Sequence, residues 1–133
     1  VEISKKAGLL VTGHFMLGFP GETREPILKT IKLACGLPFD FAQFYCCVPF
    51  PGSDLYLLAK EKGWLTTSDW HFFEQNFSVL DLPGLSSEEV INLRRLAYRK
   101  FYLRSRMILK TFFKIRSPRY FLEAILGFLN WAR

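Results

Sequence analysis

Two apolar runs separated by an amphipathic segment dominate the first half of the chain. Residues 9–17 read LLVTGHFML and residues 39–48 read FDFAQFYCCV. Runs of this kind, rich in branched and aromatic residues, favour strands buried on both faces, which are typical of parallel sheets covered by helices. Between them, apolar residues recur at helical spacing from Ile27 to Cys35, with Lys29 and Lys32 on the other side. Strand, helix and strand in this order predict a βαβ unit.

Capping residues mark where helices should begin and end. Side chains able to accept hydrogen bonds from helix N-termini precede three predicted helices at Thr23, Ser53 and Ser86. Glycines, which favour the C-terminal ends of helices, mark predicted helix ends at Gly36 and Gly63, and Gly8 closes a helix predicted over residues 1–7. The helix after Ser86 should bury one face, formed by Val90, Leu93, Ala97 and Phe101. Further helix is predicted over residues 105–116 and 118–132.

These elements divide the chain into three parts. Residues 1–63 hold the βαβ unit, residues 64–85 form an aromatic, irregular connector with room for one short strand, and residues 86–133 form a basic helical extension. The predicted class is therefore α/β. Two parallel strands without further neighbours would expose edges that pair with other chains, so we expect the isolated chain to self-associate or to be poorly soluble.

Composition narrows the class of protein. Of the 133 residues, 50% are hydrophobic and 17% aromatic, which excludes intrinsic disorder. No run of about 18 uncharged apolar residues predicts a transmembrane helix. The three cysteines suit a reducing, cytoplasmic setting better than a disulfide framework, and we expect them to pack as small hydrophobic residues. Because the chain begins with Val1 and has no initiator Met, we expect a piece of a longer protein.

Charge is distributed unevenly. Residues 1–93 carry 7 Lys/Arg against 11 Asp/Glu, whereas residues 94–133 carry 11 Lys/Arg against one Glu. Such a basic half suits an anionic partner, either a membrane surface or nucleic acid, or else a solvated helical face.

The segment most suggestive of chemistry is residues 13–23, GHFMLGFPGET. A buried strand that ends in a Gly/Pro turn lets backbone approach a ligand closely, and the following helix offers free N–H groups. Ligands of parallel α/β proteins bind at such strand ends. Neither a dinucleotide-binding glycine motif nor a phosphate loop is present.

This segment, followed by a second strand that ends in PFPGS at residues 49–53, resembles radical S-adenosylmethionine (SAM) enzymes. The branch most similar carries a cobalamin-binding domain, as in the anaerobic magnesium-protoporphyrin cyclases. The resemblance implies a partial, TIM-like (β/α)₆ barrel, of which residues 9–17 and 39–48 are the last two strands. It also implies an enzyme that cleaves SAM at a [4Fe–4S] cluster for radical chemistry on a small-molecule or lipid-like substrate, with cobalamin as a further cofactor to be tested.

The resemblance places part of the SAM site on this chain. In the family, the motif GxIxGxxE of the fifth strand lies beside the adenine of SAM. Aligning its second glycine with Gly18 puts its apolar residue at Met16 and sets His14 where the first glycine belongs, while Glu22 falls one residue late. Backbone at the end of the next strand, around Val48, is the other adenine neighbour. We expect Glu22 to serve the following helix N-terminus.

The family's Cys-x₃-Cys-x₂-Cys motif is missing, and Cys35, Cys46 and Cys47 do not have its spacing. The cluster ligands are therefore expected outside this chain, in an N-terminal part of the same enzyme that would be its partner.

Two alternatives remain open. Residues 105–132 combine Phe, Leu and Trp with Lys and Arg, as in helices that lie on membrane surfaces, although the apolar face can equally pack on the barrel. RNA contact ranks last, because the aromatic neighbours of the basic residues stand at core spacing; these residues are Arg94, Arg95, Arg99, Lys100, Arg104 and Arg106.

Overall fold

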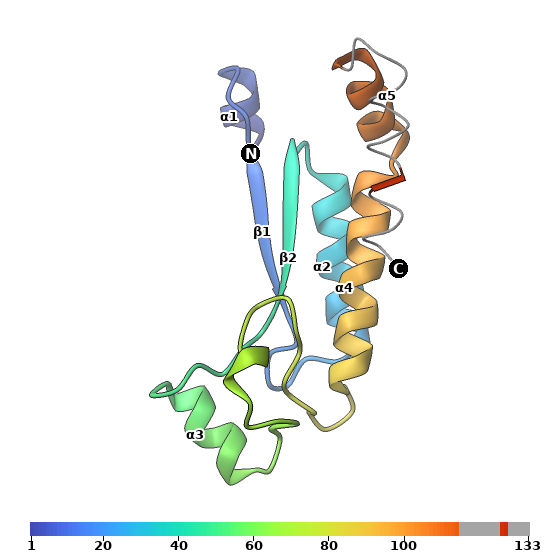
Figure 1. Ribbon diagram of the computed structural model, residues 1–133. Helices are drawn as coiled ribbons and strands as arrows, with labels where there is room; N and C mark the ends of the chain where they lie inside the picture. The colour runs from blue at the N-terminus through green and yellow to red at the C-terminus, as the bar shows by residue number, and fades with distance from the viewer. Residues whose placement is uncertain (115–125, 128–133) are drawn as a thin grey trace.

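Figure 1 shows the computed structural model, which describes residues 1–114 and 126–127. In chain order the elements are α1 (Glu2–Lys6), β1 (Thr12–Leu17), α2 (Arg24–Gly36), β2 (Phe41–Cys46), α3 (Asp54–Glu61), the 3₁₀ helix η1 (Trp70–Phe72), α4 (Ser87–Tyr102) and α5 (Ser105–Lys114). The helix predicted over residues 118–132 falls almost entirely outside the described residues.

The predicted βαβ unit is confirmed. Strands β1 and β2 pair in parallel, from Thr12 opposite Phe41 to Leu17 opposite Cys46. Both strands are shorter than predicted. The amide of Leu9 donates to the Ser4 carbonyl and closes the end of α1, so the first residues of the apolar run lie before the strand. A two-stranded parallel sheet with helices is thus the architecture of the described residues, and they do not by themselves form a barrel.

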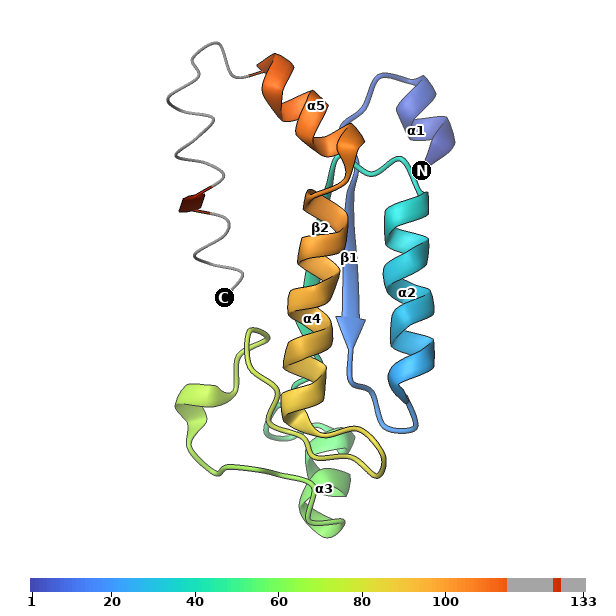
Figure 2. The same ribbon diagram turned by 90° about the vertical axis from the view of Figure 1, so that its right-hand side faces the viewer.

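The described residues cover one face of the sheet and leave the other exposed, contrary to the prediction of strands buried on both faces. Helices α2 and α4 lie side by side on that face (Figures 1 and 2). Side chains of β1 and β2 alternate between the two faces. The covered residues are Gly13, Phe15 and Leu17 on β1 and Ala42, Phe44 and Cys46 on β2. The other face, which we call the open face, carries Thr12, His14, Met16, Phe41, Gln43 and Tyr45.

The main core lies between the covered face and the two helices. Helix α2 contributes Ile27, Ile31 and Ala34. Helix α4 contributes Val90, Leu93, Ala97 and Phe101, the four residues predicted from periodicity. The Ser86 hydroxyl accepts a hydrogen bond from the Glu89 amide at 3.2 Å, which confirms the N-cap of α4. Met107 of α5 is also buried in this core, so the first turn of α5 packs on the fold as well.

The outer edge of β2 is occupied, although two bare strands were expected to expose both edges. The hydroxyls of Tyr98 and Tyr102 on α4 bond to the backbone of Phe44 and Ala42, and the Cys46 amide donates to the Gln75 carbonyl. Among the described residues, the sheet edge that remains exposed is therefore the outer edge of β1, which has no strand partner there.

The connector forms a smaller core at the carboxyl ends of the strands. Val48, Phe73 and Val79 are buried together, and the ring of Tyr56 on α3 packs against them. In place of the short strand considered for this region, the connector has η1 and two isolated antiparallel bridges, Leu65–Leu80 and Leu82–Leu85. Compact packing of aromatic side chains explains why no periodicity marks this segment.

No helix within the described part of the chain is long and apolar enough to cross a membrane.

A buried ion pair ties α1 to the amino ends of the strands. The Asp40 carboxylate is 2% exposed and accepts hydrogen bonds from Lys5 Nζ at 2.6 Å and from the Val11 amide at 2.8 Å. A carboxylate this deeply buried is tolerated only when it is paired and hydrogen-bonded.

We therefore expect Asp40→Ala to lower the free energy of unfolding by about 3 kcal/mol, because it removes the buried charged partner of Lys5 and the acceptor of the Val11 amide. Asp40→Asn keeps an acceptor for Val11 and should lose less. Urea denaturation measures both. Glu61→Ala is the control, since it breaks the exposed Glu61–Lys62 pair and should change stability by less than about 0.5 kcal/mol. Equal effects of Asp40→Ala and Glu61→Ala would contradict the assignment.

Candidate functional site

The candidate site lies where the two parallel strands end. Because the strands are parallel, the turn after β1 and the segment after β2 lie at the same end of the sheet, and the Cys47 amide donates to the Leu17 carbonyl at 2.8 Å. This end lies beside α3 and the connector (Figure 1). The structure thus brings the neighbourhoods of Gly18 and Val48 together, as the sequence reasoning required.

Glu22 organises the turn after β1. Its Oε2 accepts hydrogen bonds from the Gly18 amide at 2.8 Å and the Phe19 amide at 2.9 Å, and its own amide donates to the Phe19 carbonyl. The expectation that Glu22 serves the N-terminus of α2 is therefore wrong. The carboxylate instead folds back on the turn, because the chain reverses there and leaves two amides directed at it.

Two structural features favour glycine at position 18. Its φ of +86° lies in the left-handed region, which L side chains rarely adopt. A Cβ at this position would also stand 3.1 Å from both methyl carbons of Val90 on α4. Gly18 therefore joins the turn closely to the start of α4.

His14 and Met16 lie on the open face, as strand alternation predicts. Met16 is 38% exposed, and the ring of His14 stacks on Tyr45 with centroids 5.9 Å apart and an interplanar angle of 12°. The Tyr45 hydroxyl in turn donates to the Gln43 side chain. The sequence reasoning did not single out Tyr45 or Gln43. Alternation along β2 from Phe41 was the signal that could have placed both on this face.

Val48 takes part through its backbone. Its side chain is buried with Phe73 and Val79 in the connector core, so it is directed into protein. Any ligand at the ends of the strands would therefore meet the main chain at this position.

The three cysteines do not suit metal or cluster binding. Cys35 is on α2, Cys46 ends β2 in the main core and Cys47 follows directly after the strand. The pKa values of the Cys46 and Cys47 thiols are raised to about 11, mainly by burial, and the nearby Glu22 carboxylate contributes to the rise at Cys47. In the described part of the chain, no three His, Cys, Asp or Glu side chains are grouped so that they could hold a metal ion. The residues present therefore do not fit a [4Fe–4S] cluster, which needs converging thiolates.

Two arginines of the basic half are engaged within the fold. Arg94 Nε donates to the Phe44 carbonyl at 2.8 Å and its NH2 group donates to Asn76 Oδ1 at 2.7 Å. Arg104 Nε donates to the Phe101 carbonyl, and its guanidinium lies 4.0 Å from the centre of the Phe101 ring. Sequence reasoning grouped both with surface charges, because the backbone acceptors they meet are remote in sequence.

We expect Glu22→Ala to lower the free energy of unfolding by about 2 kcal/mol, since two amide donors lose a charged acceptor. Glu22→Gln keeps one carbonyl oxygen in place and should lose about half as much. Thermal or urea denaturation measures the difference. A Glu22→Gln loss as large as that of Glu22→Ala would show that charge, and not hydrogen bonding, holds the turn.

The Cys46 and Cys47 thiols should react slowly with thiol reagents in the folded chain. With the pKa of Cys46 and Cys47 raised from 9.0 to about 11, the thiolate fraction at pH 8 falls about a hundredfold relative to the unfolded chain. Reaction with a coloured disulfide reagent, with and without urea, measures this. The folded state holds the thiol protons of Cys46 and Cys47 more tightly than the unfolded state does. The resulting stabilisation of the fold is therefore complete below pH 9 and is lost as the pH rises through 11. Native thiols that react as fast as unfolded ones would contradict the burial.

Comparison with known proteins relates the chain to enzymes. No protein-family model matches it. The chain is 40% identical, over 114 residues, to an uncharacterized methyltransferase of Pyrococcus horikoshii; the match covers 86% of this chain and 25% of the relative. It is 23% identical, over 128 residues, to the anaerobic magnesium-protoporphyrin IX monomethyl ester cyclase of Rubrivivax gelatinosus, over 95% of this chain and 22% of the relative.

The chain thus spans about a quarter of the length of these two relatives. Both are named as enzymes, one a methyltransferase and the other a cyclase. The cyclase is named as the kind of enzyme that the motifs at residues 13–23 and 49–53 resemble. The sequence similarity to it is not confined to these motifs and covers nearly the whole chain.

Proposed function

We propose that this chain is part of a radical SAM enzyme and supplies a section of the wall beside SAM. The observation that carries the proposal is the parallel pair β1 and β2, with one face open and a glycine turn at its carboxyl end. In parallel α/β proteins, ligands bind at this end of the strands. The identity to a protein named as a methyltransferase supports a SAM-dependent reaction, with methyl transfer as the outcome to test first.

Met16 and backbone at Gly18 and Val48 are the groups that would contact the adenine. Met16 is exposed on the open face near the end of β1, and an apolar, polarizable side chain suits a base ring. His14 lies two residues before Met16 on the same face, and its stacking partner Tyr45 lies opposite Met16 on β2, so both would border the ligand. Bound there, SAM would supply the radical chemistry typical of the family, and this chain would orient it and exclude water.

The cluster ligands would come from a preceding part of a longer chain, because Cys35, Cys46 and Cys47 do not converge. Cobalamin, if it is used, would likewise bind outside these residues. The substrate would be a small or lipid-like molecule held between this wall and the rest of the enzyme.

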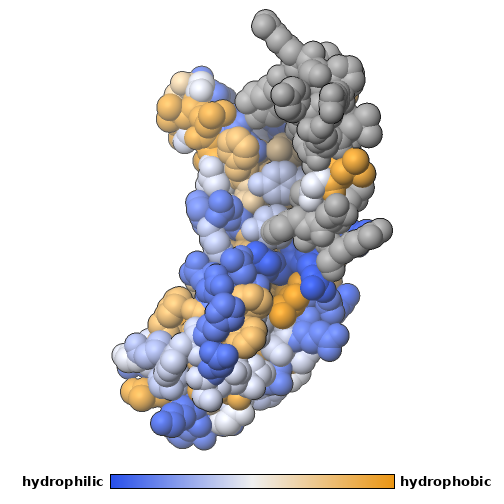
Figure 3. All heavy atoms as spheres, viewed as in Figure 1, coloured by the Kyte–Doolittle hydropathy of each residue, from blue (hydrophilic) through white to orange (hydrophobic). Residues whose placement is uncertain are grey.

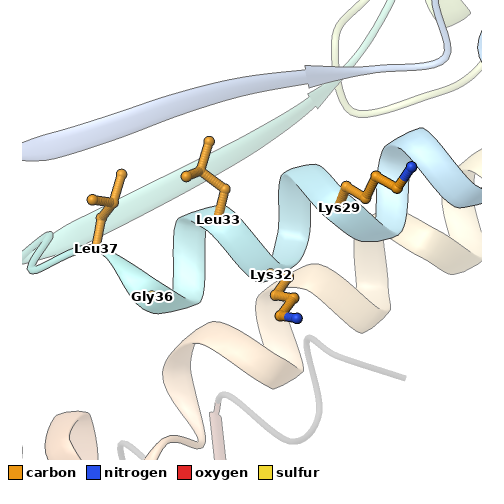
Figure 4. A pocket seen from close by; sticks show the side chains of 5 residues that line it. All are labelled: Lys29, Lys32, Leu33, Gly36 and Leu37. Carbon is orange, nitrogen blue, oxygen red and sulfur yellow. The ribbon is translucent and has the colours of Figure 1, made fainter.

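The same preceding part would cover the outer edge of β1 and the adjoining side of α2. Hydrophobic residues gather over α1 and the start of β1 (Figure 3), where Ile3, Leu9 and Leu10 are exposed. On α2, a shallow groove is lined by Lys29, Lys32, Leu33, Gly36 and Leu37. Figure 4 shows Leu33 and Leu37 pointing to the same side of the helix, and Leu33 is 57% exposed. An unpaired strand beside exposed leucines is what a neighbouring strand and helix would cover.

The two alternatives, RNA contact and association with a membrane surface, have less support. Arg94 and Arg104 are held by the fold, which leaves fewer arginines for RNA phosphates. Residues 105–132, proposed to contact a membrane, lie mostly outside the described residues, and Met107 at their start is buried in the core.

In a longer protein that contains this chain, Met16→Asp should weaken SAM binding by at least about tenfold, because it sets a carboxylate against the adenine. Met16→Leu should have a mild effect, since it conserves volume and polarity. Calorimetric titration with SAM, and formation of 5′-deoxyadenosine under anaerobic conditions, measure the effects. Transfer of label from methyl-labelled SAM distinguishes methyl transfer from other outcomes. Unchanged SAM binding in Met16→Asp would refute the adenine wall.

The 133-residue chain by itself is the reference for this experiment. Without converging thiolates it should form no 5′-deoxyadenosine after treatment with iron, sulfide and a strong reductant. Turnover by this chain alone would overturn the proposal that the cluster lies elsewhere.

A further inference from the structure

The outward-facing backbone groups of Ala42 and Phe44 on β2 are bonded to side chains of α4 and not to a strand. The Ala42 amide donates to the Tyr102 hydroxyl at 3.2 Å, and the same hydroxyl donates to the Ala42 carbonyl at 2.9 Å. The Phe44 amide donates to the Tyr98 hydroxyl at 3.1 Å, and this hydroxyl donates back to the Phe44 carbonyl at 3.4 Å. A phenol can donate and accept at once, so each tyrosine replaces both groups that a neighbouring strand residue would offer.

The spacing of the two tyrosines matches the strand. Successive outward residues of a strand are about 6.6 Å apart, and residues four apart on a helix are separated by about 6 Å along its axis. Tyr98 and Tyr102 are four apart on α4 and meet Phe44 and Ala42, two apart on β2, in antiparallel order. Helix α4 therefore presents hydroxyls at nearly the repeat of a sheet.

The row of side chains continues along α4 and is held in place. Arg94, one further turn toward the N-terminus, donates to the Phe44 carbonyl, and its guanidinium lies 5.2 Å from the centre of the Tyr98 ring. The rings of Tyr98 and Tyr102 stack with an interplanar angle of 12°. Ala97 and Phe101, their neighbours on the helix, are buried in the main core, which fixes the distance between α4 and β2.

We propose that Tyr98 and Tyr102 terminate the sheet at β2, so that an added strand can pair only at the outer edge of β1. The partner they exclude is an extended segment of another chain, in the first instance the same strand of a second copy. Edge strands with unpaired amides and carbonyls are templates for such pairing, and the two hydroxyls occupy those groups. This role of α4 is independent of what binds at the strand ends.

The test is the double variant Tyr98→Phe/Tyr102→Phe in the 133-residue chain, which removes two hydroxyls and keeps both rings. Amide hydrogen exchange, resolved by residue and measured on dilute protein, should speed up about tenfold at Ala42 and Phe44. The amides of Gln43 and Tyr45, which face β1 in the parallel ladder, should keep their rates and report that the fold is intact. Tyr56→Phe, which removes a hydroxyl in the connector core, should change none of the four.

The dependence of self-association on protein concentration provides the second measurement. In the double variant, light scattering should show the molar mass rising with concentration more steeply than in the wild type, and exchange at Ala42 and Phe44 should slow again in the oligomer. Exchange at these two amides that stays at the wild-type rate in dilute variant would overturn the proposal. So would a variant oligomer that protects His14 and Met16 in place of Ala42 and Phe44.

Discussion

The contact between α4 and β2 sets the geometry of the rest of the fold. Two parallel strands have two outer edges, and the backbone groups on each must bond to something other than a strand. At β2, Tyr98 and Tyr102 supply these bonds, and the adjacent Ala97 and Phe101 enter the core. Since both kinds of contact arise from one helix, α4 is fixed in rotation and in height relative to the sheet. Its first turn then meets Gly18, so the position of the strand-end turn follows from the same packing.

Covering one face of a sheet decides where chemistry can take place. Helices α2 and α4 cover Phe15, Leu17 and Phe44, and alternation therefore presents His14, Met16 and Tyr45 on the open face. The turn held by Glu22 lies at the end of this face. Under the function proposed above, this mixed polar and apolar surface, with the tight turn at its end, would form one section of a larger enclosure around SAM.

The basic half of the chain illustrates how charge counts mislead. Arg94 and Arg104 contribute to the excess of positive charge, yet both donate to backbone carbonyls and lie over aromatic rings. Arginine suits this use because its planar guanidinium offers several donors and stacks on rings. Part of the apparent anion-binding surface therefore holds the helical extension to the sheet.

The sequence by itself determined the order of elements, the parallel βαβ unit, the N-cap at Ser86 and the buried face of α4, because local periodicity and capping carry those signals. It also placed His14 and Met16 on one face of β1. Only the tertiary structure decided that the sheet is covered on one face, that Glu22 binds the amides of its own turn, and that Asp40 pairs with Lys5. It likewise decided that Tyr98 and Tyr102 close an edge. These features join residues far apart in the chain or depend on how the backbone reverses, and neither periodicity nor composition records which donor meets which acceptor after folding.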